Sequence, residues 1–175
     1  MSKSLKNFIR IKDFLSDASL SSEPATDLRI FFLQHKYDAD LHYSADRIRE
    51  ASALRIKVEN FISLCSQVKR ETPPFLKYTR SSSLFGQILL SLKNKVLYAL
   101  ADDLDVPLAL HCISELIGEG HKYLHLLTSS EKDLRHPVEP LLEAQAYIVD
   151  FFRKLGVSFD ADVSSNVCFQ SISSS

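Results

Sequence analysis

The sequence is poor in several residue types, and each shortage narrows the choice of fold and function. Only four of its 175 residues are glycine, which argues against a glycine-rich nucleotide fold or a many-turned all-β protein. The three cysteines, Cys65, Cys112 and Cys168, lie far apart and form no CxxC pair. We therefore expect no zinc site in this chain and a reducing compartment. Apolar runs such as residues 30–33 are too short to span a bilayer, and no signal core follows the first residues, so we expect a soluble, cytoplasmic protein without membrane contact.

The charges nearly balance but are unevenly distributed. There are 21 lysines and arginines against 22 aspartates and glutamates, for a net charge of −1. That balance argues against a strongly basic nucleic-acid-binding protein. Residues 1–12, however, contain four basic side chains and no acid, which leaves an acidic remainder. The near-zero net charge therefore averages a basic head with an acidic body, and it does not exclude RNA as a partner.

The apolar spacing predicts a mainly α protein, with a short α+β connecting segment followed by a helical bundle. Residues 8–11 alternate weakly and predict a short strand, and helices are expected over 11–17 and from Pro24 to about residue 35. The strongest signal predicts a helix over 44–71, with Ser44 as N-cap. Its apolar stripe comprises Ile48, Ala51, Leu54, Val58, Phe61, Ile62, Cys65 and Val68. Further helices are expected over 84–100, 105–127 and 137–155.

These elements predict three regions. Residues 1–43 form a connecting segment, residues 44–156 the helical bundle, and residues 157–175 a Ser-rich tail whose last ten or so residues are expected to be disordered. Gly156 is the expected stop of the last helix.

Three stretches carry a resemblance to a known family. The opening MSKSLKNFIRIK resembles the KMSKS signature of class I aminoacyl-tRNA synthetases, and its longer form is similar to cysteine–tRNA ligases, with Lys6 as in their eukaryotic cytosolic branch. Residues 25–29 (ATDLR) resemble the family's DALR motif, and residues 99–110 resemble its acidic turn before a Pro-capped helix. The resemblance covers residues 1 to about 156 and implies a DALR-type anticodon-binding domain.

The resemblance also implies an activity. The full enzyme activates cysteine with ATP and attaches it to tRNA(Cys). The leading Lys of the signature, the nucleotide-binding fold, the HIGH motif and the thiolate-binding zinc have no counterpart in this sequence. The chain is therefore expected to be a C-terminal piece that begins inside the signature. It would partner the missing N-terminal catalytic domain, hold no cofactor of its own, and be unable to aminoacylate alone.

The resemblance assigns the ATP-binding loop to Met1, Ser2, Lys3 and Ser4. Lys3 matches the second lysine of the signature, whose ammonium contacts ATP phosphates and stabilises the charge that develops as pyrophosphate leaves. In the isolated chain we expect this segment to be a solvated terminus.

Seven residues are candidate tRNA contacts: Lys6, Arg10, Lys12, Arg29, Lys77, Tyr78 and Arg80. Those before residue 13 would meet phosphates of the inner tRNA corner without reading sequence. Arg29 either reaches tRNA or pairs with an acid such as Asp13 or Asp17. The basic and aromatic residues near 77–80 suit single-stranded bases, although a plain interhelical loop is the more common role for such a stretch.

Other clusters have ordinary explanations. His121 and His125 are four residues apart, but no HExxH pattern or third ligand accompanies them, so we expect a surface or half-buried pair without a metal. The acids at 102–105 are expected to mark a helix boundary. The alternative to a ligase fragment is a stand-alone helical protein-interaction module, or a degenerate paralogue without ligase activity.

Overall fold

Helices dominate the part of the chain that the structure describes. The structure is a computed structural model that describes residues 10–16, 21–71, 84–128 and 137–159. Within these ranges it contains α1 (Ile11–Ser16), α2 (Pro24–Leu33), α3 (Ala45–Glu71), α4 (Leu84–Ala101), α5 (Val106–Thr128) and α6 (Glu139–Lys154), and no strand. The predicted helical bundle is confirmed. Of the strand expected at 8–11, residues 8 and 9 lie outside the described ranges and Ile11 begins α1, because the carbonyl of Arg10 accepts the amides of Asp13 and Phe14.

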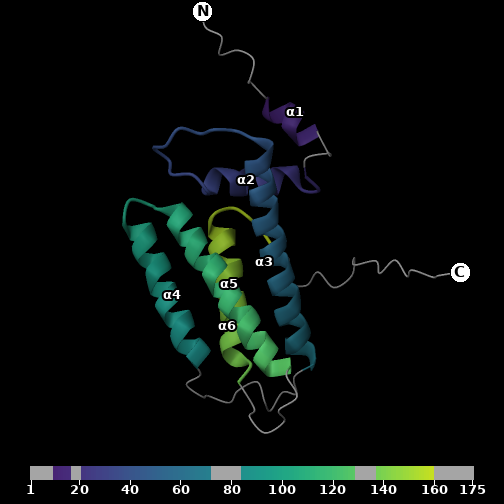
Figure 1. The fold of residues 1–175 in the computed structure, drawn as a ribbon, viewed down its shortest axis with the longest axis vertical. Coiled ribbons are helices and arrows are strands. Elements are labelled where there is room, and N and C mark those ends of the chain that lie inside the picture. The colour runs from purple at the N-terminus through teal and green to yellow at the C-terminus, as the bar shows by residue number, and fades with distance from the viewer. Residues whose placement is uncertain (1–9, 17–20, 72–83, 129–136, 160–175) are drawn as a thin grey trace, which may run out of the picture.

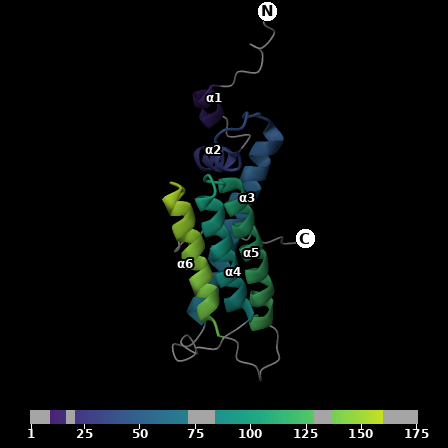
Figure 2. The same ribbon diagram turned by 90° about the vertical axis from the view of Figure 1, so that its left-hand side faces the viewer.

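The long helices α3, α4, α5 and α6 lie side by side, and α1 and α2 occupy one end of the resulting bundle (Figures 1 and 2). α4 packs mainly on α5, while α3 contacts α5, α6 and α2. Phe61 and Ile62 of α3, Ile113 of α5 and Phe152 of α6 are among the buried core residues. Burial of such side chains, at about 1.5–3 kcal/mol each, drives the assembly.

The helix ends use the residues that the sequence indicated. Ser44 caps α3, with its Oγ accepting the amide of Arg47 at 3.2 Å. Asp105 caps α5, with its Oδ1 accepting the amide of Leu108 at 3.0 Å. Gly156 follows α6 with a φ of 77°, a conformation that glycine adopts without steric cost. The predicted cap at Ser44, helix boundary at residues 102–105 and stop at Gly156 are confirmed.

The stripe predicted along α3 packs against the core, with Leu54 and Val68 half-buried, but the prediction omitted one buried residue. Arg55, the neighbour of Leu54, is 4% exposed and occupies the buried side of the helix. Arg55 follows Ala51 by four residues and precedes Val58 by three, so the helical period places it on the buried stripe. A charged side chain thus stands in a core position, and its partners determine how α3 meets α2.

The described chain remains packed past α6. Val157 is 2% exposed, and the Phe159 ring lies edge-on to Phe152 at 5.1 Å between centroids. The rest of the Ser-rich segment lies outside the described residues. In the ranges that the structure covers, no helix has the length and apolar character that crossing a membrane requires.

Candidate nucleic-acid interface

The sequence-predicted site residues fall into two groups. Eight lie outside the described ranges: Met1, Ser2, Lys3, Ser4, Lys6, Lys77, Tyr78 and Arg80. The other three are Arg10, which immediately precedes α1, Lys12 in α1 and Arg29 in α2. The structure therefore tests the geometry only at the α1–α2 end of the molecule.

Arg10 and Lys12 differ in their availability. Arg10 forms a two-point ion pair with Asp13, with its Nε 2.8 Å from Oδ2 and its Nη2 3.0 Å from Oδ1. Such planar pairing matches a guanidinium to a carboxylate and compensates its charge. Lys12 is exposed, and its ammonium makes no ion pair within the described part of the chain. Of these two candidates, Lys12 has the positive charge that no carboxylate compensates and that is free to bind a phosphate.

Arg29 is used inside the molecule. Its Nη1 donates to the carbonyl oxygen of Gly156 at 2.6 Å, which places a cation at the carboxyl end of α6, where the helix dipole favours it. A Cβ at Gly156 would lie 2.1 Å from that nitrogen. The expected acid partner is wrong for Asp13, which binds Arg10, while Asp17 lies outside the described residues.

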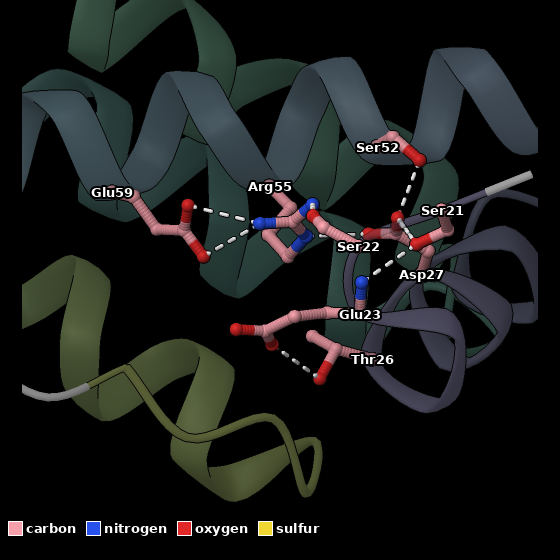
Figure 3. Close-up of polar contacts among 8 residues, drawn as sticks. All are labelled: Ser21, Ser22, Glu23, Thr26, Asp27, Ser52, Arg55 and Glu59. Carbon is pink, nitrogen blue, oxygen red and sulfur yellow. Dashed lines mark hydrogen bonds and ion pairs between the residues drawn. The ribbon is translucent and has the colours of Figure 1, made fainter. Parts of the chain in front are cut away.

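A buried ion pair joins α2 to α3 (Figure 3). Asp27 of α2 is fully buried, and its Oδ1 accepts a hydrogen bond from the Nε of Arg55 at 2.6 Å. Its other oxygen accepts hydrogen bonds from the hydroxyls of Ser21 and Ser52. The carboxylate is therefore satisfied on both oxygens, as burial of a charge requires.

The guanidinium of Arg55 is satisfied as well (Figure 3). Its Nη1 donates to both carboxylate oxygens of Glu59 at 3.0 Å, and its Nη2 donates to the hydroxyl of Ser22 at 3.0 Å. Burial would lower the pKa of Arg55, but the hydrogen bonds to Asp27 and Glu59 raise it above its ordinary value. Among described residues no buried side-chain nitrogen or oxygen lacks a partner. This network is structural: it fixes α2 against α3.

An aromatic cluster, formed by Phe14, Phe31, His35 and Tyr43, holds α1 and the α2–α3 loop over α2. The Phe14 and Phe31 rings each meet Tyr43 edge-on at 6.3 Å, and Phe31 meets His35 at 4.8 Å. The cluster thus brings α1, the end of α2 and the start of α3 to one end of the molecule (Figure 1). The basic residues at this end were predicted from the sequence, whereas the contacts among these rings were not.

The α2–α3 loop also docks on the turn between α4 and α5. The Nζ of Lys36 lies 2.9 Å from Asp105, and the hydroxyl of Tyr37 donates to Asp103 at 2.7 Å. The hydrogen bond and charge of Asp105 raise the pKa of Lys36, and Lys36 in turn lowers the pKa of Asp105. The acidic turn therefore serves in capping and docking, as a helix boundary does.

Among the described residues, no cluster of three or more histidine, cysteine or carboxylate side chains could hold a metal ion. His121 is half-buried with its ring edge-on to Phe61 at 5.6 Å, while His125 is exposed. Burial, together with the charge of Lys57, lowers the pKa of His121. The prediction of a half-buried or surface pair is confirmed.

Comparison with known proteins gives a consistent relationship. The chain is 28% identical over 174 residues to the cytoplasmic cysteine–tRNA ligase of Dictyostelium discoideum, covering 98% of the chain and 25% of that protein. It is 30% identical over 158 residues to the cysteine–tRNA ligase of Encephalitozoon cuniculi (90% and 30%), and 26% identical over 168 residues to the human cytoplasmic cysteine–tRNA ligase (94% and 21%). The chain thus spans about a third or less of the length of these relatives. No family model matches it.

Proposed function

Because this chain is a homologue of the cysteine–tRNA ligases over about 90% or more of its length, we propose that it is the C-terminal, tRNA-binding part of such a ligase. The observation that carries the proposal is this match, which spans the described helices. The whole enzyme would activate cysteine with ATP and attach it to tRNA(Cys) in the cytoplasm.

Within that enzyme, the chain would contribute two things. Met1, Ser2, Lys3 and Ser4 would form the signature loop around the ATP phosphates, with Lys3 stabilising the charge that develops there. The helices would bind tRNA through basic residues at both ends of the bundle. ATP is a substrate here, and the zinc that grips the cysteine thiolate would belong to the catalytic domain rather than to this chain.

Two long-range contacts hold α2 on the bundle. Asp27 ties α2 to Arg55 of α3, and Arg29 ties it to Gly156 beyond α6. α2, with α1 in contact with it, is therefore fixed to one end of the bundle. The candidates Lys77, Tyr78 and Arg80 belong to the sequence between α3 and α4, outside the described residues. A rigid frame of this kind suits a ligand as extended as tRNA, which makes contacts along its backbone.

A binding measurement tests the tRNA role. We expect the chain to bind a tRNA(Cys) transcript with an affinity that falls as salt rises. The double variant Lys77→Glu/Arg80→Glu should bind at least about tenfold more weakly, with a salt slope reduced by about 0.7–0.9 for each lost phosphate contact. The control Arg153→Glu/Lys154→Glu makes the same charge change at exposed residues that pair with Asp150 and should retain most of the affinity.

Two results would contradict the proposal. Equal losses of tRNA affinity in both double variants would mean that the loss arises from net charge alone. Cysteine- and ATP-dependent charging of tRNA by the pure chain would contradict its dependence on a separate catalytic domain.

A second function is favoured by one observation. α4 presents large apolar side chains to solvent, with exposed fractions of 74% for Leu84, 62% for Leu90, 64% for Leu97 and 74% for Tyr98. Exposed apolar surface of this kind is typical of protein docking. Salt-independent binding to a protein, without any tRNA binding, would favour this interaction module over the ligase role.

A further inference from the structure

The arginines of the described chain differ in what neutralises them. Arg10, Arg49, Arg55 and Arg153 each form an ion pair with a carboxylate. Arg47 contacts the Nε2 of the His35 ring and makes no ion pair with any carboxylate of the described residues. It therefore keeps its full positive charge while its side chain is held in place.

The hydrogen bonds of His35 fix its role. Its Nδ1 lies 2.7 Å from the carbonyl oxygen of Phe31, an acceptor, so Nδ1 must carry the proton. The Nη1 of Arg47 lies 2.5 Å from Nε2, and because a guanidinium can only donate, Nε2 is the acceptor in this contact. The edge contact with Phe31 at 4.8 Å holds the ring itself. His35 thus presents a lone pair that orients the guanidinium without cancelling its charge.

Arg47 is also fixed through its main chain. Its amide donates to the capping hydroxyl of Ser44, which places it in the first turn of the 27-residue helix α3. A cation at this end of a helix meets the positive end of the helix dipole, which is unfavourable unless an anion lies nearby. The neighbouring acid Asp46 is taken by Arg49, so an anion from outside would gain from both Arg47 and the helix.

We infer that Arg47, oriented by His35, is a phosphate-binding residue that grips a backbone phosphodiester of the bound RNA. This inference rests on the proposed function and adds residues that sequence analysis did not single out. The same end of the molecule carries Lys12 on α1 (Figure 1), so the RNA backbone passes over α1 and the start of α3. The remaining N–H groups of a guanidinium suit a phosphate oxygen pair.

The test compares two arginines on one helix. The 175-residue chain carrying Arg47→Gln should bind a tRNA(Cys) transcript roughly tenfold more weakly than the unmodified chain, as expected for a lost charged hydrogen bond. Its salt slope should be smaller by about 0.7–0.9, the value for one phosphate. Arg49→Gln removes the same charge two residues away from a side chain already paired with Asp46, and its affinity should stay within about twofold of wild type.

Variants of His35 test the positioning step. His35→Phe keeps the ring against Phe31 but loses the acceptor, so it should weaken RNA binding and reduce the salt slope in the same direction as Arg47→Gln. The double variant His35→Phe/Arg47→Gln should bind no more weakly than Arg47→Gln alone, because both changes remove one contact. His35→Gln, whose amide oxygen can accept, should recover part of the affinity. Thermal unfolding of each variant should match wild type within a few degrees.

Three other results would overturn parts of this proposal. Equal behaviour of Arg47→Gln and Arg49→Gln overturns the phosphate contact while leaving tRNA binding intact. Additive effects of His35→Phe and Arg47→Gln overturn the positioning role. If the wild-type chain fails to bind RNA at any salt concentration, the proposed function itself falls, and this site falls with it.

Discussion

Replacing Arg55 by methionine is expected to destabilise the protein by about 3–5 kcal/mol. The variant leaves Asp27, which is fully buried, with only the hydroxyls of Ser21 and Ser52 as partners. Those hydroxyls donate hydrogen bonds but no charge, so a carboxylate remains in a low-dielectric interior without a counterion. Urea denaturation should show a lower midpoint, and the melting temperature should fall by roughly 10 °C.

Two further variants separate the charge from the packing. Asp27→Leu combined with Arg55→Met removes both ions and should be far more stable than Arg55→Met, because no unpaired charge stays buried. Glu59→Gln changes the outer end of the network, where the Glu59 side chain is 39% exposed, and should cost no more than about 1 kcal/mol. A double variant as unstable as Arg55→Met would show that packing, not the unpaired carboxylate, carries the effect.

Gly120→Leu is expected to cost at least about 3 kcal/mol, the upper end of the range for overpacking. Gly120 lies in α5 against the fully buried ring of Phe61 in α3, and a Cβ there would lie 2.5 Å from that ring. The ring belongs to the packed core, so the helices themselves would have to separate. Chemical denaturation, with the far-ultraviolet circular dichroism of the native state as a check on folding, measures the loss.

Gly118 provides the matched control in the same helix. A Cβ at this position meets nothing within 4 Å, so Gly118→Leu should stabilise the protein by up to about 1 kcal/mol through helix propensity. The two leucine substitutions should therefore move the denaturation midpoint in opposite directions. A loss of stability in both would mean that the glycines are needed for helix geometry rather than for the approach of Phe61.

Local features of the fold were predictable from the sequence. The caps Ser44 and Asp105 act within three residues, so the signal and its partner lie in the same turn. The long helix α3 was equally clear, because its apolar residues repeat with the helical period. Such elements need no knowledge of the tertiary structure, and their predicted bounds agree closely with the observed ones.

The contacts that position the candidate interface were not predictable in the same way. Asp27 and Arg55 are 28 residues apart, and Arg29 binds a backbone carbonyl 127 residues away. A backbone acceptor leaves no trace in the residue type, so sequence analysis sought an acid for Arg29. For Arg55 a signal existed: it occupies the helical period between Ala51 and Val58, where a charge predicts a buried partner. The His35–Arg47 contact had no comparable signal, since both residues look like solvated polar side chains.

The two ties of α2 bear on how the protein opens. An isolated helix of ten residues is marginal in water, and most segments of this size at a chain end fray on their own. Here, detaching α2 would expose the Asp27–Arg55 pair and release the carboxyl end of α6 from Arg29. We therefore expect α2 to belong to the same cooperative folding unit as the four long helices, so that its amide protons exchange with solvent only when that whole unit opens.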